Sequence, residues 1–193
     1  MDEIISDYSL HFDEINALVA YSFVKITDRD YVKSIIDDIL SLLIEAYVLG
    51  INHTATMLDY EIPVNSGDMY DAIYFIIEGK NFEDRVIEHL SKDDLTALQT
   101  LVETEYHRIY NAAVLDGAAY YNHETGTDVL KTWVTVGDER VRDTHSYLEG
   151  QSVLLDELFF TYDGDSAPYP GGFRKAQNNV NCRCIIILST NII

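Results

Sequence analysis

The residues most able to do chemistry in this sequence are two cysteines near its C-terminal end, in the stretch NNVNCRC. Cys182 and Cys184 are the only cysteines of the chain, and a single arginine separates them. In an extended segment, residues two apart point to the same side, so the two thiols would lie together. A disulfide that closes over one intervening residue would be strained, and we therefore favour two other interpretations.

The first of these interpretations is that both cysteines are small buried residues that continue the inward face of a strand, and we favour it. The second is half of a zinc site, because thiolates are typical zinc ligands. His145 is then the third candidate ligand, and His123 or Asp143 is a weaker fourth. We therefore expect no cofactor, with zinc as the one alternative.

A second group of polar residues lies in the stretch VTVGDERVRDTHSYLEG. Asp138 follows a glycine and is a suitable N-cap for a short helix over residues 139–147, which Gly150 would end. On such a helix, Asp138, Arg142 and His145 are spaced i, i+4 and i+7 and share one face. The set could catalyse a reaction or bind a ligand, but we favour a salt-bridged face with a partly buried histidine.

The composition is that of a globular protein, with 47% hydrophobic and 24% charged residues among 193. It excludes an intrinsically disordered chain. The sequence holds no apolar run of the ~18 residues that a membrane-spanning helix needs, and its N-terminus is acidic where a signal peptide is basic. Gly-rich phosphate loops, His-Glu-x-x-His and Gly-x-Ser-x-Gly are absent from it. We expect neither a membrane partner nor secretion.

The net charge of −20 is unevenly distributed along the chain. From Asp128 onward, six Lys or Arg residues face nine Asp or Glu residues, so most of the negative charge lies before that point. Affinity for nucleic acid comes from neutralising phosphate with Lys and Arg. The first part of the chain should therefore be repelled by bare DNA and should contact water or protein instead.

Residues 1–127 are predicted to form an acidic helical region. Apolar periodicity predicts helices over residues 13–26 and 31–58, and the second carries a broad apolar face from Ile36 to Leu43. Two shorter helices are expected near residues 69–78 and 82–89, and Ser91 would cap a long helix that runs to residue 122. The broad face should be buried in a bundle, within the chain or between copies.

Residues 128–193 have a different character. The stretch LKTWVTV predicts a strand, GQSVLLDELFF and CIIILS predict further strand pieces, and YDGDSAPYPGGF predicts a turn-rich loop. The predicted fold class is α+β, with an N-terminal helical region followed by a compact C-terminal α+β module of short strands.

The order of these motifs resembles the phage Mu protein F-like family of minor head and head morphogenesis proteins, over roughly residues 101–186. The family has a Trp-bearing strand, then Asp, Arg and His, a Leu-x-Gly, a Phe, a Pro-Gly loop and Asn-Cys-Arg-Cys. The matching residues in this sequence are Trp133, Asp138, Arg142, His145, Leu148, Gly150, Phe159 or Phe160, Pro170, Gly171, Asn181, Cys182, Arg183 and Cys184. Upstream, ETEYHRIYNAA resembles the helix that precedes the family's module.

The resemblance implies a minor capsid protein of a tailed phage or prophage, with no enzyme activity. Such a protein is made in the host bacterial cytoplasm and is located in the virion, inside the head near the portal vertex. Its expected partner is the portal protein or the major capsid protein, or both, with self-association as a further option, whereas the net charge argues against direct DNA binding. The alternative is a nucleic-acid-processing or transferase enzyme, or a toxin-related module, that uses Asp138, Arg142 and His145.

Overall fold

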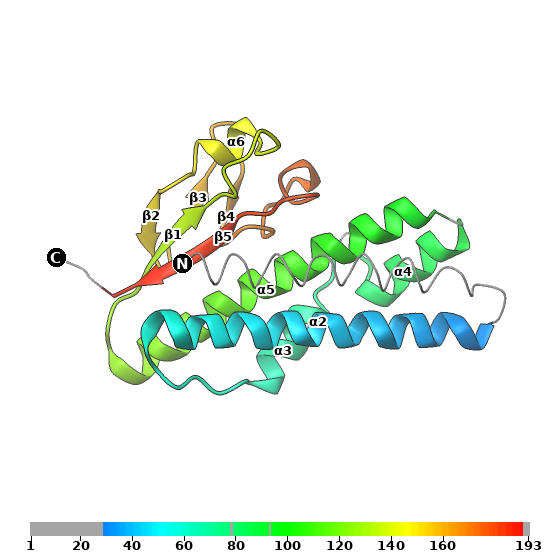
Figure 1. The fold of residues 1–193 in the computed structure, drawn as a ribbon, viewed down its shortest axis with the longest axis horizontal. Helices are drawn as coiled ribbons and strands as arrows, with labels where there is room; N and C mark the ends of the chain where they lie inside the picture. Colours follow the sequence, from blue (N-terminus) through cyan, green and yellow to red (C-terminus); the bar gives the residue numbers. More distant parts are fainter. Residues whose placement is uncertain (1–28, 78, 93, 191–193) are drawn as a thin grey trace.

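The computed structural model describes residues 29–77, 79–92 and 94–190, so the predicted helix over residues 13–26 lies outside it. Four helices come first in the described part, and short strands follow them. The predicted α+β fold class is confirmed (Figure 1). The helices are α2 (Arg29–Leu58), α3 (Ser66–Ile73), α4 (Phe82–Ser91), α5 (Leu95–Thr125) and the short α6 (Asp143–Ser146).

The two long helices, α2 and α5, lie along each other and form the base of the molecule (Figure 1). They approach closely at Gly50, where a Cβ atom would lie 2.5 Å from the carbonyl oxygen of Tyr110 and 2.7 Å from the Cβ of Ala113. Ile36 and Leu43 of the broad apolar face are buried within the chain. Of the two expected forms of burial, the structure shows the bundle within the chain.

The helix ends depend on capping side chains, and two predicted boundaries are wrong. The predicted helix over residues 69–78 is α3, which begins at Ser66 and ends at Ile73; the Asn65 side chain accepts hydrogen bonds from two backbone N–H groups of its first turn. Ser91 does not cap the next long helix, because it is the last residue of α4. The N-cap of α5 is Asp94, whose side chain accepts a hydrogen bond from the Ala97 N–H.

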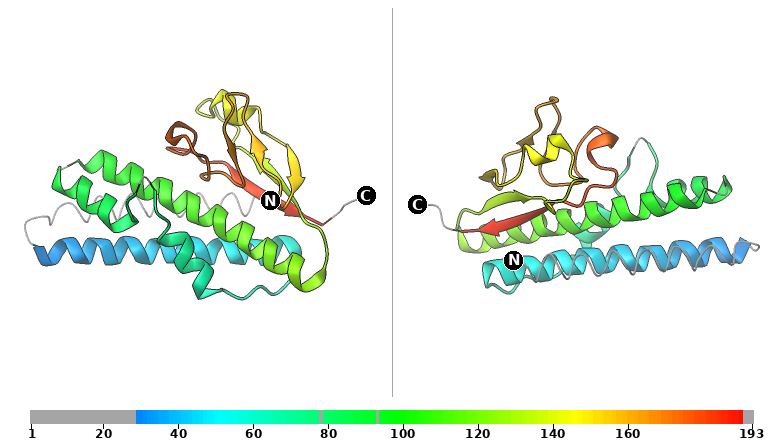
Figure 2. Two further views of the ribbon diagram at one scale, coloured as in Figure 1. Left: turned by 180° about the vertical axis from the view of Figure 1, so that it is seen from behind. Right: turned by 45° about the horizontal axis from the view of Figure 1, so that its top comes forward.

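The C-terminal part is built on a three-stranded antiparallel sheet in the order β2-β1-β5. Its strands are β2 (Ser152–Leu154), β1 (Leu130–Val134) and β5 (Ile185–Ser189). A second sheet pairs β3 (Phe159–Phe160) with β4 (Ser166–Ala167), and β4 lies in the stretch predicted to be only a turn-rich loop. Figure 2 shows the three-stranded sheet on the side of α5 that faces away from most of α2.

The sheet is attached to the helices through a shared core and through one side chain of α5. Tyr47, Trp133 and Ile186 belong to a single cluster of buried apolar residues. The Asn111 side chain donates a hydrogen bond to the Cys184 carbonyl oxygen and accepts one from the Ile186 N–H. Asn111 therefore fixes the start of β5 against α5, and this attachment positions the two cysteines.

Candidate functional site

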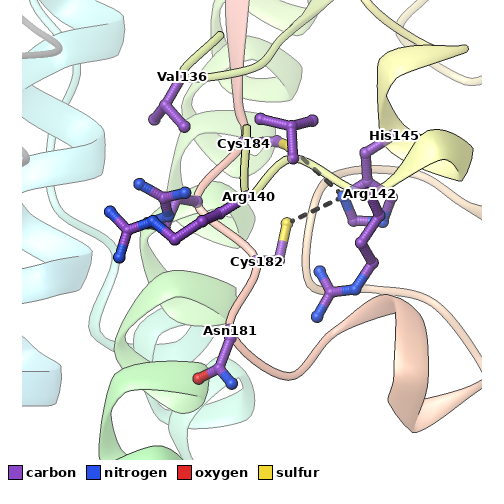
Figure 3. Close-up of a pocket in the computed structure, with 9 residues that line it drawn as sticks. Val136, Arg140, Arg142, His145, Asn181, Cys182 and Cys184 are labelled. Atoms are coloured by element: carbon purple, nitrogen blue, oxygen red, sulfur yellow. Dashed lines mark hydrogen bonds between the residues drawn. The ribbon is translucent and has the colours of Figure 1, made fainter. Parts of the chain in front are cut away.

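The three side chains predicted as metal ligands lie together in a buried cluster. The Sγ atoms of Cys182 and Cys184 are 3.5 Å and 3.4 Å from Nδ1 of His145 (Figure 3). The three candidate ligand atoms all lie within 4.8 Å of one another, and both cysteines are free. The weaker candidates, His123 and Asp143, are exposed and do not belong to this group. Zinc binding itself stays a prediction.

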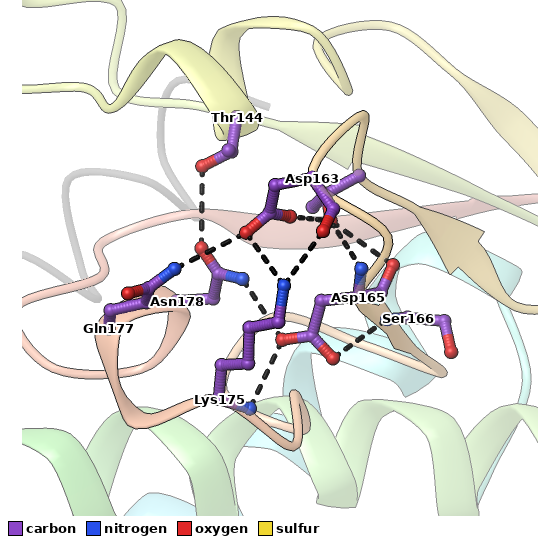
Figure 4. Close-up of polar contacts among 8 residues, drawn as sticks. Thr144, Asp163, Asp165, Ser166, Lys175, Gln177 and Asn178 are labelled. Atoms are coloured by element: carbon purple, nitrogen blue, oxygen red, sulfur yellow. Dashed lines mark hydrogen bonds and ion pairs between the residues drawn. The ribbon is translucent and has the colours of Figure 1, made fainter.

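Three asparagines before Cys182 form the turn and the hydrogen bonds that position the two cysteines. Asn181 has a left-handed backbone with φ +56°, which turns the chain just before Cys182. The Asn179 amide donates to the backbone carbonyl of Phe173 and accepts from its N–H. The buried Asn178 accepts from Thr144 and donates to Asp165 (Figure 4). These bonds hold the segment before the cysteines in one shape.

His145 lies on a helix that is shorter than predicted. The predicted helix over residues 139–147 with Asp138 as its N-cap is wrong, because α6 covers Asp143–Ser146 and its N-cap is Arg142. Asp138 forms a turn instead, in which its carboxylate accepts a hydrogen bond from the Arg140 N–H. Asp138, Arg142 and His145 therefore do not share one helix face.

The arginine between the two cysteines, Arg183, pairs with Asp138. Its guanidinium donates two parallel hydrogen bonds to the Asp138 carboxylate, of 2.8 Å and 2.7 Å. These bonds from Arg183 are the first cause of the lowered pKa of Asp138, which falls to about 2. Arg142 donates to the backbone carbonyl of Val180 instead of pairing with Asp138. The two arginines thus join the loop after β1 to the segment before β5.

Aromatic rings enclose the His145 imidazole. The Trp133 ring meets it edge-on, with ring centroids 5.4 Å apart, and Phe173 stacks on it at 5.5 Å. Its Nε2 atom is buried without a hydrogen-bond partner among the described residues. Only the Nδ1 side of the ring therefore meets polar atoms, and those atoms are the two thiols.

His107 of α5 is a fourth polar residue beside the cluster, and sequence reasoning missed it. The side chain is fully buried and lies close enough to Cys182 to influence its ionisation. Burial raises the pKa of the Cys182 thiol, but hydrogen bonds with Cys184, His107 and His145 and the charge of His107 outweigh it and lower the pKa well below its usual value. A lone histidine on a helix has no spacing signal that could have revealed this contact.

The predicted Pro-Gly loop packs directly on α5 next to His107. Gly171, which follows Pro170, has φ +90°. A Cβ atom at this position would lie 3.0 Å from the Cα of Arg108 and 3.3 Å from the Cδ2 of His107. Gly150 serves a different contact, because its N–H donates to the Trp133 carbonyl and closes the turn after α6 onto β1.

A second polar cluster joins three helices, α3, α4 and α5. Glu105 of α5 accepts hydrogen bonds from Arg85 of α4 at 2.9 Å and from Arg108 at 2.8 Å. Arg108 also donates to the backbone carbonyl of Ala72 in α3. Burial would raise the pKa of Glu105, but the two guanidinium groups outweigh that effect and lower it. Glu105 and Arg108 are buried and Arg85 is partly exposed, and the bonds among them hold α3 and α4 on α5.

The fold and the site define a class of protein: a long helical pair carries a small sheet module, and polar side chains of that module join its loops around a small pocket. The chain belongs to the family described as Phage Mu protein F like protein, which matches residues 70–187. The resemblance seen in the motif order is therefore confirmed, and the match begins earlier than the motifs indicated.

Two curated proteins show what this chain is similar to. It is 28% identical over 152 residues to the NAD(+)--arginine ADP-ribosyltransferase EFV of Enterococcus faecalis. This match covers 78% of this chain and 31% of that protein. It is 32% identical over 98 residues to the minor head protein GP7 of Bacillus phage SPP1. This match covers 51% of this chain and 30% of that protein. The chain thus spans about a third of either relative, and no solved structure matches it.

Among the described helices, none is both long enough and apolar enough to cross a membrane.

Proposed function

We propose that this chain is a minor head protein of a tailed phage or prophage, which acts in head assembly at or inside the portal vertex. The observation that carries the proposal is membership of the Phage Mu protein F-like family together with the similarity to the minor head protein of phage SPP1. The portal protein and the major capsid protein are the partners that this role requires, with the virion as the location.

The site geometry supports a role without enzyme activity. A catalytic base must reach a proton of its substrate, directly or through one water. His145 is 1% exposed, and its Nδ1 atom faces the two thiols. Asp138 is held by Arg183, and Arg142 donates to the Val180 carbonyl. All three residues of the enzyme alternative are thus occupied in contacts that join loops.

The similarity to a transferase is compatible with this proposal. The two matched stretches are together longer than this chain, so they overlap within it. The same region is therefore found in a protein named as a transferase and in a protein named as a head component. Each relative has most of its length outside the match. We assign the region shared with the head protein to head association in this chain.

The strong negative charge favours a protein partner over DNA. At a net charge of −20, Asp and Glu outnumber Lys and Arg by 33 to 13, so the chain as a whole would be repelled by the phosphates of a duplex. The portal protein or the inner wall of the capsid is therefore the surface that this chain would contact.

The test of this function is to tag the chain in the phage or prophage that encodes it and to purify heads from strains with and without the portal gene. We expect the tagged chain in heads that contain the portal and its loss from heads that lack it. Heads that assemble with portal but never contain the chain would contradict the proposal.

The enzyme alternative needs its own measurement, on the purified chain. We expect neither nucleic-acid cleavage nor transfer of ADP-ribose from labelled NAD⁺ to arginine-containing protein, and no change with His145→Ala. An activity that purifies with the chain, is lost in His145→Ala and is retained in the exposed-site variant His123→Ala would establish an enzyme instead.

A further inference from the structure

We propose that Cys182, Cys184 and His145 bind one zinc ion, which fastens α6 to the start of β5. In tetrahedral zinc sites the Zn–S distance is ~2.3 Å and the Zn–N distance is ~2.1 Å, so that a sulfur and a nitrogen ligand lie about 3.6 Å apart. The two observed Sγ–Nδ1 distances are 3.5 Å and 3.4 Å. The ligand atoms therefore already stand close to the spacing that a single ion requires.

Hydrogen bonding alone is a poor explanation for two thiols that lie against the same nitrogen atom of His145. A neutral imidazole nitrogen has either one lone pair or one proton, so Nδ1 of His145 can make one good hydrogen bond. Two thiols nevertheless approach this one atom at nearly equal distance (Figure 3). A metal ion in the space between the three atoms would satisfy both sulfur atoms and the nitrogen together.

The burial of the cluster favours a cation in its centre. Cys182, Cys184 and His145 are each at most 3% exposed, and a buried thiolate is costly unless a positive charge accompanies it. The Arg183 guanidinium is engaged with Asp138 and leaves the sulfur atoms to another partner.

The neighbours of the ligands fit supporting roles. Trp133 and Phe173 pack on the His145 ring and fix its orientation. His107 contacts Cys182 but does not belong to the group of mutually close ligand atoms, so we assign it the positioning of the Cys182 sulfur. A small pocket lined by Arg142 and Asn181 opens on the ligands, where a water molecule can take the fourth position (Figure 3).

Zinc would join segments that are distant in sequence. His145 belongs to α6, and the cysteines precede β5 after the loops that contain β3 and β4. Closing such a loop has an entropic cost, and an ion held from both ends offsets part of it because structural zinc contributes directly to folding. We therefore propose that the zinc site stabilises the folded C-terminal module. This role does not depend on which partner the whole chain binds.

The first experiment is elemental analysis of the full chain, purified under reducing conditions after expression with added zinc. We expect about one zinc per chain. Cys182→Ser, Cys184→Ser and His145→Asn should each bind less than about one-tenth of an equivalent, whereas the control His123→Asn should retain the metal, because its side chain is 85% exposed. A wild-type chain that holds less than about one-tenth of an equivalent, even after refolding with zinc, would overturn the proposal.

A second experiment does not depend on the folding of any variant. Cobalt(II) titrated into the metal-free wild-type chain should give thiolate-to-cobalt charge-transfer absorption that saturates at one equivalent and disappears on addition of zinc. Binding without a thiolate band would show that the cysteines are not the ligands. His107→Gln should keep the stoichiometry but weaken zinc affinity by ~10–100-fold, the usual effect of an outer partner of a ligand; an unchanged affinity would remove His107 from the site.

Discussion

Arg142 joins two loops at the scale of a single residue, because its guanidinium donates to the Val180 carbonyl in the segment before the cysteines. Arg142→Ala leaves that carbonyl without its donor and should lower the free energy of unfolding by about 1–3 kcal/mol. Urea denaturation of the purified chain measures the effect. The matched control is Arg140→Ala, whose side chain is 73% exposed and should change stability by less than about 0.5 kcal/mol. Equal losses in the two variants would exclude a role for the Val180 contact.

Asp116 makes the stability of the chain depend on pH. Burial raises its pKa from 3.8 to about 6, although the Tyr47 hydroxyl donates to its carboxylate at 3.0 Å and opposes the shift. Because the pKa is higher in the folded state than in the unfolded state, the stability contributed by the protonated form is present below pH 3.8. It is lost as the pH rises through about 6.

Asp116→Asn should therefore stabilise the chain at pH 7.5, by about 1–2 kcal/mol once partial exposure of the side chain is allowed for. The amide oxygen can still accept the Tyr47 hydrogen bond. The gain should be smaller at pH 5, where the native carboxyl is mostly protonated. Urea denaturation at both pH values tests this, with the exposed Asp71→Asn as control. A gain that is independent of pH would assign the effect to something other than ionisation.

At the scale of elements, the Pro-Gly loop determines how closely the C-terminal module approaches α5. Gly171→Ala combines an unfavourable positive φ with a Cβ atom only 3.0 Å from the Cα of Arg108, so we expect a loss of about 2–4 kcal/mol. Gly164 has a similar φ of +79° but nothing within 4 Å of an added Cβ. Gly164→Ala should therefore cost only about 1 kcal/mol. Thermal unfolding of both variants separates the packing effect from the backbone effect, and similar melting temperatures would show that the close approach is unimportant.

Local sequence patterns predict the long helix α2 better than the short helix α6. The α2 helix was predicted within two residues at its start, because apolar periodicity over thirty residues is a strong signal. The α6 helix was predicted too long, because the Asp138 side chain and carbonyl stabilise a turn where a helix start was expected. Short elements depend on such single contacts, which a pattern of residue types does not resolve.

At the scale of the whole molecule, the proposed contact with the head could be made by the acidic surface or by exposed apolar residues. The broad apolar face of α2 is buried within the chain and cannot serve. Exposed apolar side chains remain near α3, at Tyr70, Phe75 and Ile76, and in the C-terminal module, at Phe160 and Tyr162. Contacts through these residues would not be screened by salt, in contrast to contacts between exposed charges.

We therefore expect the chain to stay bound when DNA-free heads are washed with salt raised from ~0.05 M to ~0.5 M, a range over which exposed charge pairs are screened. Immunoblots of the pellet and the supernatant give the result. Heads washed at the lower salt concentration are the control for loss by dilution. Release of the chain into the high-salt supernatant would show that its acidic surface is the anchor.

The sequence by itself determined the fold class and the family, and it named the three residues of the buried Cys-His cluster as candidates. These follow from local information: the period of apolar residues, the turn residues of YDGDSAPYPGGF, and the order of short motifs from Trp133 to Cys184. The extended segment around Cys182 was enough to place both thiols on one side.

The tertiary structure alone decided which polar groups meet. Asp138 pairs with Arg183 and not with Arg142, Arg142 reaches Val180, and His107 lies against Cys182. Each of these contacts joins segments far apart in the sequence, and the choice among several acceptors for one guanidinium depends on how the loops pack against α5. Packing of that kind is a property of the whole core, so residue type and spacing could name the participants but not their partners.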